Sequence, residues 1–306
     1  METKENKLLS RLSAPLLVLT TVIWGSSFII MKDSVVALSP LWLLAIRFTA
    51  SGLLLALIML PRWRLLNRSY LLGGAVMGVF LWAGYTLQTF GLFYTTPGKN
   101  AFLTTVYCII VPFLYWAVAK RRPDRYNIIA AVLCLTGVGL LSITGEDAAS
   151  AFNIGDVLTL MGGFFFASHI LAVEHFSRDK DIFLLTVLQF LTFALLSWLS
   201  LAVARPPLNL SVFEPALIGK LAYLVVFVSC GGLLFQNVAQ KYTAPTKAAV
   251  LLSLEAPFGV LFSFLITHEI PEPSALLGFS LIFLAVVCSE TKLSFLRHKK
   301  TAEGAS

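Results

Sequence analysis

Two ionisable side chains lie inside apolar stretches of this sequence, where a charge is costly. Glu255 precedes Pro257 in a run that otherwise carries little charge, and Arg47 lies in an apolar run near the N-terminus. A charge buried in a membrane is expensive unless it is paired or in contact with water, so such residues are functional candidates. Counted from the ends of their apolar runs, Glu255 and Arg47 lie at similar depths in the membrane. The side chain of Arg47 is long enough to span the difference between the two depths. We therefore expect Glu255 and Arg47 to serve a polar cavity or one of its gates, the alternative being a structural ion pair. Proton coupling at Glu255 is the weaker option, because a carboxylate that keeps an arginine partner stays ionised.

Uncharged polar and aromatic side chains recur in neighbouring apolar runs, and they predict contacts with a small-molecule substrate. These candidates are Gln88, Tyr107, Gln236, Asn237, Trp82, Tyr85 and His169. For the aromatic residues, including the run Phe164 to Phe166, packing or lipid contact is the alternative. His169 could instead be satisfied by a neighbouring helix. The sequence contains no phosphate-binding glycine loop, metal-ligand spacing or nucleophile–base pair, so it predicts no cofactor, no metal site and no enzymatic activity.

The composition places these residues in a membrane protein. Of 306 residues, 58% are hydrophobic and 13% are charged, whereas soluble domains carry about 25% charged residues. The lipid bilayer is therefore the expected partner. The net charge of +7 does not indicate nucleic acid, because the basic residues fall in short loops between apolar runs, where they orient helices. The four cysteines lie within apolar runs and are expected to be small buried residues.

Apolar stretches long enough to cross a bilayer need roughly 20 residues, and this length predicts an all-α protein with ten transmembrane helices. The predicted spans are 14–31, 39–60, 71–93, 98–118, 126–144, 155–174, 182–203, 217–240, 246–267 and 274–290. Lys and Arg concentrate in alternate connectors, and this bias puts both termini in the cytoplasm. Segments 1–13 and 291–306 are then cytoplasmic tails.

An internal repeat relates the two halves of the chain. The stretch Tyr94 to Lys99 recurs as Tyr242 to Lys247, 148 positions later, and the same shift relates Gln88 to Gln236. Five spans in each half make the second half enter the membrane from the opposite face. The chain therefore predicts two inverted repeats, 14–144 and 155–290, joined by an extracytoplasmic connector at 145–154. Secondary transporters with inverted repeats bind substrate near mid-membrane between the repeats.

Prolines mark special positions in the fourth and ninth spans. Pro97 and Pro245 suit the first turn of a helix, with the threonine two positions earlier as a cap. Pro112 and Pro257 lie deeper, where proline removes a backbone hydrogen bond. We expect an interrupted helix at each, which indicates a binding region or a gating bend; an ordinary kink is the alternative.

Small residues at helical spacing predict close helix packing. Gly74 and Gly78 lie in the third span, and Gly163 and Ala167 in the sixth. Such spacing lets two backbones approach. We expect these residues to serve packing within the chain, the alternative being a homodimer.

The residues together resemble a known family. Trp24 to Phe28, Arg47-Phe48, the two helix-starting prolines, and Leu254 to Pro257 are similar to motifs of the EamA-like members of the drug/metabolite transporter superfamily. The resemblance covers about residues 14 to 290. It implies a ten-helix secondary carrier built from two inverted five-helix repeats, often an exporter of amino acids or related metabolites. The family often shows a Gly-Glu pair at the end of the fourth and ninth spans. Here the ninth span ends His268-Glu269, but the fourth ends Lys120-Arg121 and departs from that pattern.

These observations predict a multi-pass transporter of the inner or plasma membrane that works by alternating access. Its expected substrates are small metabolites, amino acids or related compounds, moved out of the cell. Within transport, the alternative is efflux of drugs or lipid-linked compounds. Outside transport, the alternatives are an integral membrane enzyme and a receptor-like scaffold.

Overall fold

The described part of the chain consists of helices and the loops that connect them, without a strand. A computed structural model describes residues 4–95, 97–120, 122–142, 153–267 and 273–291. The helices of the first half are α1 (Lys4–Ala37), α2 (Pro40–Ile58), the 3-10 helix η1 (Leu60–Leu65), α3 (Arg68–Tyr94), α4 (Pro97–Thr104), α5 (Tyr107–Ala119) and α6 (Arg125–Ser142). The second half contains α7 (Ile154–Ser177), α8 (Ile182–Ala204), the 3-10 turn η3 (Leu210–Val212), α9 (Pro215–Tyr223), the π-helix η4 (Leu224–Leu233), α10 (Leu234–Gln240), α11 (Pro245–Leu252), α12 (Glu255–Thr267) and α13 (Pro273–Thr291).

Each predicted span corresponds to one helix or to a run of consecutive helices. Within the described ranges, seven helical stretches are long and apolar enough to cross a membrane, and two shorter apolar helices cover Tyr107–Ala119 and Arg125–Gly137. The crossing number of ten stays a prediction. α1 begins at Lys4, inside the segment 1–13 that the sequence predicts as a tail. Most of the predicted connector 145–154 and nearly all of the tail 291–306 lie outside the described residues, as do His268 and Glu269.

Polar side chains at loop ends start several of these helices. Asn67 precedes α3, and its Oδ1 accepts from the backbone N–H groups of Ser69 and Tyr70 at 2.9 and 3.2 Å. Asn153 and Asp156 form a reciprocal capping box at the start of α7. Such caps satisfy N–H groups that have no partner within the helix.

The threonine cap that the sequence predicts before Pro245 is not formed. Pro97 and Pro245 do begin α4 and α11, as expected. However, the hydroxyl of Thr243 has no hydrogen-bond partner, and the hydroxyl of Thr95 donates to the Asp156 carboxylate at 3.2 Å. Proline alone is enough to start a helix, because its fixed φ suits the first turn.

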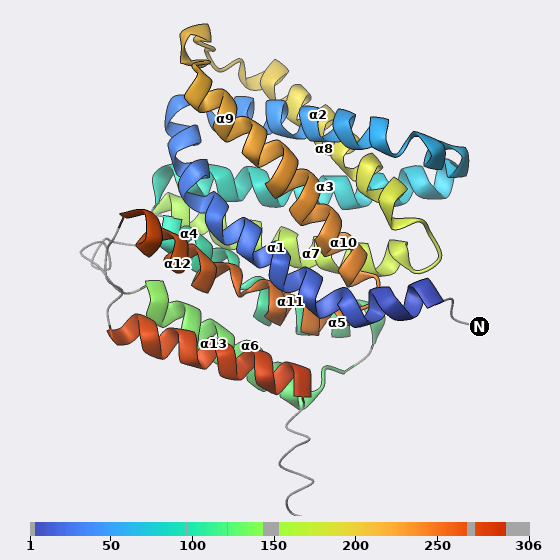
Figure 1. The fold of residues 1–306 in the computed structure, drawn as a ribbon, viewed down its shortest axis with the longest axis vertical. Helices are drawn as coiled ribbons and strands as arrows, with labels where there is room; N and C mark the ends of the chain where they lie inside the picture. The colour runs from blue at the N-terminus through green and yellow to red at the C-terminus, as the bar shows by residue number, and fades with distance from the viewer. Residues whose placement is uncertain (1–3, 96, 121, 143–152, 268–272, 292–306) are drawn as a thin grey trace, which may run out of the picture.

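Helices of the first half pack on their counterparts in the second half. α6 lies along α13 at one edge of the molecule, and α2 lies along α8 at the opposite edge (Figure 1). Contacts between α3 and α7 have their counterpart in contacts between α1 and the η4–α10 stretch. In the centre, α4 packs on α12 and α5 packs on α11. Because α4 precedes α5 and α11 precedes α12, these two interrupted helices run antiparallel.

The two copies of the repeated stretch lie at opposite ends of the bundle. Thr95 contacts Asp156 at the start of α7, whereas Lys241 donates to the Lys180 carbonyl, just past the end of α7, at 2.8 Å. α7 contains 24 residues, which corresponds to about 36 Å at 1.5 Å per residue. The stretches therefore begin their central helices from opposite ends of the bundle, and the inverted topology in a membrane stays a prediction.

The interruptions fall at equivalent positions in the two central helices. α4 and α5 are separated by Thr105 and Val106, and α11 and α12 by Ser253 and Leu254, 148 positions later. Both junctions tighten in the same way, with Val106 N–H donating to Leu103 and Leu254 N–H donating to Leu251. These bonds span three residues, as in a 3-10 helix, where an α-helical bond spans four. Each junction is therefore a short turn that is narrower than an α-helix.

The prolines account for only one of these breaks. Pro257 lies in the first turn of α12, four positions after Ser253, where its ring prevents a continuous helix. Pro112 lies inside α5, well past the Thr105–Val106 junction. The prediction that Pro112 marks the interruption is therefore wrong in position, because α5 continues through this proline as a kink-tolerant membrane helix can.

Glycines at the predicted small-residue positions serve contacts within the chain. A Cβ on Gly74 would lie 2.3 Å from the Leu188 Cβ, and one on Gly78 would lie 2.6 Å from the Thr192 Cβ. Gly163 similarly faces Val106 at the first junction, 2.7 Å from its Cγ1. Packing within the chain is thus confirmed for these residues, and the homodimer stays a prediction.

Candidate functional site

A cavity lies where the two interrupted helices meet the surrounding bundle. Its volume is about 50 Å³, which leaves room for a few water molecules, since each needs roughly 10–15 Å³. Both halves contribute walls: α1 to α5 on one side, and α7, η4, α10, α11 and α12 on the other. Of the predicted substrate residues, the lining includes Arg47, Tyr85, Gln88, Tyr107, His169, Gln236 and Glu255.

Glu255 is the first residue of α12, directly after the junction at Ser253 and Leu254. Its side chain is 4% exposed, and its Oε1 accepts a hydrogen bond from the Tyr107 hydroxyl at 3.1 Å. Tyr107 is likewise the first residue of α5 and lies 148 positions earlier. Tyrosine and glutamate, at equivalent positions of the two repeat copies, therefore meet at the cavity.

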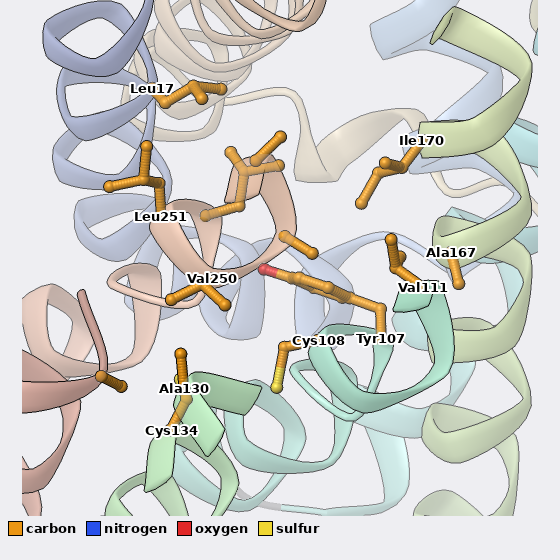
Figure 2. Close-up of a cluster of buried hydrophobic side chains, with 14 of the residues drawn as sticks. Leu17, Tyr107, Cys108, Val111, Ala130, Cys134, Ala167, Ile170, Val250 and Leu251 are labelled. Atoms are coloured by element: carbon orange, nitrogen blue, oxygen red, sulfur yellow. The ribbon is translucent and has the colours of Figure 1, made fainter. Parts of the chain in front are cut away.

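Tyr107 is packed tightly among buried hydrophobic side chains. Figure 2 shows its ring extending from the start of α5 toward the helix that carries Val250 and Leu251, with Cys108 beside it. Ser253 at the facing junction bonds Cys134 of α6 at 2.7 Å between oxygen and sulfur. This packing holds the phenol in a defined orientation toward α12.

Arg47 comes from the middle of α2 and is 1% exposed. Its Nε donates to the Ser229 hydroxyl at 2.6 Å, and its Nη1 approaches the Met31 sulfur at 3.3 Å. The guanidinium lies 5.1 Å from the centre of the Tyr85 ring, a distance that suits a cation–π contact. Its Nη2 has no hydrogen-bond partner.

Arg47 and Glu255 do not form an ion pair. The Arg47 donors are directed to Ser229 and Met31, and Glu255 accepts from Tyr107. The two side chains line the same cavity without a direct contact. The alternative of an ion pair that braces the halves is therefore wrong, and the cavity wall carries one cationic and one carboxyl group.

The repeat-related glutamines both face this cavity. Gln88 donates from Nε2 to the Thr104 hydroxyl at 3.1 Å, and Gln236 donates from Nε2 to the Gln240 side chain at 3.4 Å. The Oε1 of Gln236 is buried without a hydrogen-bond partner. An unsatisfied buried amide oxygen is costly, so it is a candidate acceptor for a ligand or a water molecule.

His169 lines the cavity and also has a partner from a neighbouring helix. Its Nε2 lies 3.0 Å from the Oε1 of Gln189 in α8. Gln189 occupies the position in the second half that Arg47 occupies in the first, 142 residues earlier. Because Gln189 is neutral, His169 stays a positioned polar group. It lines the cavity and is also hydrogen-bonded by a neighbouring helix, so the two expectations for this residue are compatible.

Two predicted residues lie elsewhere. Asn237 is buried on the other side of α10, where its Nδ2 donates to the Thr186 hydroxyl at 3.0 Å. Trp82 packs against the apolar cluster around Phe48 and Phe190. Helix rotation explains the place of Asn237, because one position along a helix turns a side chain by about 100° from that of Gln236.

Several lining residues were not among the sequence candidates. Asn100 and Thr104 lie one turn apart on α4, and Asn100 bonds the Thr159 hydroxyl at 2.8 Å. Trp24 lines the cavity from α1, and its indole N–H donates to the Val228 carbonyl in the π-helix at 3.2 Å. Phe166, from the run Phe164 to Phe166 that the sequence did offer as a candidate, also lines the cavity. The spacing of Asn100 and Thr104 in an apolar run was a usable signal for a polar helix face.

The cavity has the chemistry of a binding site. Its wall combines amides, hydroxyls and aromatic rings with one guanidinium and one carboxyl group. Among the described residues no cluster of three or more His, Cys, Asp or Glu could hold a metal ion. An enclosed apolar pocket with a few convergent polar groups is typical of small-molecule sites.

Comparison with known proteins identifies the family. The model of the EamA-like transporter family matches twice, at residues 11–143 and 153–291. The chain belongs to the EamA-like transporter family. It is a multi-pass membrane transporter, and the matched ranges include every cavity residue.

Similar proteins extend this assignment. An uncharacterized transporter of Archaeoglobus fulgidus is 33% identical over 273 residues, which cover 89% of this chain and 83% of the relative. The uncharacterized transporter YwfM of Bacillus subtilis is 29% identical over 201 residues, 64% of each chain. A solved structure titled only as a crystal structure of a protein matches with a TM-score of 0.76 and 16% identity, covering 93% of this chain and 98% of the other. That likeness concerns the fold alone.

Proposed function

We propose that this protein is a secondary carrier that exports small metabolites, amino acids or related compounds, by alternating access. The observation that carries the proposal is the central cavity, in which Arg47 and Glu255 are buried without pairing with each other. A fully packed structural core would not keep two unpaired ionisable groups, because each costs several kcal/mol. Contact with a polar substrate during part of the cycle offsets that cost.

Alternating access is supported by the relation between the halves. The family model matches two consecutive segments, and equivalent helices pack on one another with the interrupted pair antiparallel. Two inverted repeats can exchange conformations, so that rocking one against the other opens the cavity to each side in turn. The short junctions beside Tyr107 and Glu255 are natural points for that bend.

The proposed location is the cell membrane, with both termini in the cytoplasm. Clusters such as Arg62 to Arg68 and Lys120 to Arg125 would then face the cytoplasm, following the positive-inside rule. On this orientation the Tyr94–Lys99 stretch faces outward and the Tyr242–Lys247 stretch faces inward.

The substrate class follows from the wall of the cavity. A guanidinium and a carboxyl group offer partners for both an anionic and a cationic substrate group, while Trp24, Tyr85 and Phe166 contact an apolar part. Efflux of drugs or lipid-linked compounds is the competing possibility, and a purely apolar or cationic substrate would favour it.

The test compares metabolites in the medium of cells that overproduce the protein and cells that lack it. The flux of the accumulated compound is then measured in proteoliposomes.

Glu255→Gln and Arg47→Ala should each reduce this flux by about tenfold or more, since a charge-assisted hydrogen bond contributes about 1.5–3 kcal/mol. Matched controls are Glu174→Gln and Arg178→Ala, because these residues pair with each other outside the cavity. Unchanged flux in both cavity variants would remove the polar-cavity mechanism.

A further inference from the structure

The surroundings of Glu255 contain no cation at ion-pair distance. Its hydrogen bond comes from the Tyr107 hydroxyl, a neutral donor, and its second carboxyl oxygen has no partner in the part of the chain that the structure describes. The salt bridges of the described residues join Arg62, Arg178 and Lys220 to other carboxylates. An ionised Glu255 would therefore be a buried charge without a counterion.

The other titratable groups near this carboxyl group are few. From the helices around the cavity these are Arg47 on α2, Tyr85 on α3, Tyr107 on α5 and His169 on α7. On α6, Cys134 bonds Ser253 at the adjacent junction. α1 and α4 contribute Trp24, Ser27, Asn100 and Thr104, which are uncharged. Arg47 is the one permanent cation among these groups, and its contacts are with Ser229 and Met31.

Two opposing effects act on the charge of Glu255. Removing an ion from water costs several kcal/mol even after relaxation. The start of a helix favours a negative charge by at most about 2 kcal/mol, and Glu255 is the first residue of α12. Burial is thus the larger effect while the cavity is closed. When the cavity opens to water, the burial penalty falls and the helix start favours the ionised form.

We propose that Glu255 is the proton-binding site that couples this carrier to a proton gradient. The carboxylate takes a proton from hydronium on the side to which the cavity opens, which gives the neutral acid and water. The acid crosses the closed state and returns its proton to water on the other side. Tyr107 positions the carboxyl group in both forms, because its hydroxyl can donate to a carboxylate or to a carbonyl oxygen. This inference rests on the proposed transport function.

The proton site can be tested without any substrate. Dicyclohexylcarbodiimide is an apolar reagent that modifies protonated carboxyl groups, and the modified position is located by peptide mass spectrometry of the full-length protein in vesicles. Glu255 should be labelled at low pH, and labelling should fall about tenfold per pH unit above its midpoint, as expected for one titrating group. Tyr107→Phe should move that midpoint. Glu174→Gln, outside the cavity, should leave the profile unchanged. Labelling of Glu255 that does not depend on pH, or its absence at every pH in folded protein, overturns the proposal.

Coupling is then measured with a pH-sensitive dye enclosed in proteoliposomes, using the metabolite identified from the medium. Wild-type protein should move protons when the metabolite moves. The reduced metabolite flux that remains in Glu255→Gln should carry no protons, measured as protons moved per metabolite moved. Proton movement that persists in Glu255→Gln rejects the proposal. If labelling follows pH but no metabolite moves, the proton site stands and the transport function fails.

Discussion

At the scale of single residues, the candidate site consists of polar groups whose partners are neutral. Glu255 bonds a phenol, Arg47 bonds a hydroxyl and a thioether, and His169 bonds an amide. This arrangement keeps each group oriented without fixing it in an ion pair. A substrate or a proton can then change the balance of charge in the cavity at modest cost, since no strong pair has to be broken first.

The contact between His169 and Gln189 should be a measurable coupling. Gln189→Leu leaves a buried imidazole nitrogen unpaired and should lower the free energy of unfolding by about 1–3 kcal/mol. His169→Leu should have an effect of similar size. The double variant should lose less than the sum, with a coupling of about 0.5–3 kcal/mol, as measured by thermal unfolding in detergent. Strict additivity would contradict the hydrogen bond.

Much of this site could be predicted from residue types alone. Arg47, Gln88 and Glu255 were recognisable because a polar or charged group in an apolar run needs a partner or water. Trp82 and Asn237 are not among the residues that line the cavity, because the direction in which a residue faces depends on how its helix packs. Asn100 was missed although its position in an apolar run carried the same signal as Gln88.

At the scale of elements, short interruptions and close contacts position the cavity. The junctions at Thr105–Val106 and Ser253–Leu254 place Tyr107 and Glu255 at helix starts. The π-helix η4 adds an irregular wall beside Arg47, and neighbouring side chains use its carbonyls: Trp24 donates to Val228 at 3.2 Å and Thr20 to Gly232 at 3.3 Å. Irregular backbone in a membrane is tolerated where such partners exist, and π segments often occur at functional sites.

The contact between α3 and α8 should depend on Gly78. Gly78→Ala would put a methyl group 2.6 Å from the Thr192 Cβ and 2.7 Å from the Gln189 carbonyl oxygen, and backbone atoms cannot yield as a side chain can. We expect a loss of about 1–3 kcal/mol in stability, seen as a lower unfolding temperature in detergent.

Gly219 in α9 provides the matched control for this substitution. A Cβ there would meet nothing within 4 Å, so Gly219→Ala should be neutral or raise stability by up to about 1 kcal/mol, because alanine favours a helix over glycine. Equal effects of the two substitutions would show that α3 and α8 are not in close contact at this point.

At the scale of the whole molecule, the two halves pack as counterparts around one cavity. α6 with α13 and α2 with α8 form the edges, and the antiparallel pair of interrupted helices forms the centre. The two halves differ at the cavity, where Tyr107 of the first half faces Glu255 of the second. Equivalent helices of the two halves therefore surround a cavity whose polar side chains are not equivalent.

The inverted arrangement predicts opposite labelling of the two repeated stretches. Tyr94 and Ala244 are exposed at opposite ends of the bundle, and the four native cysteines are buried, so background labelling should be low. With a membrane-impermeant maleimide, Tyr94→Cys should react on intact cells and Ala244→Cys only in inverted vesicles. Reaction of both from the same side would refute the inverted topology.

The sequence by itself determined the class of protein, the places of its helices and the internal repeat. These properties depend on local composition and spacing: apolar runs must match the bilayer, and proline starts or stops a helix through its own ring. Only the tertiary structure decided that Tyr107 meets Glu255, that Arg47 bonds Ser229 instead, and that the first interruption precedes Pro112. Those outcomes depend on the rotation and close approach of helices distant in the chain, which packing sets and local sequence does not encode.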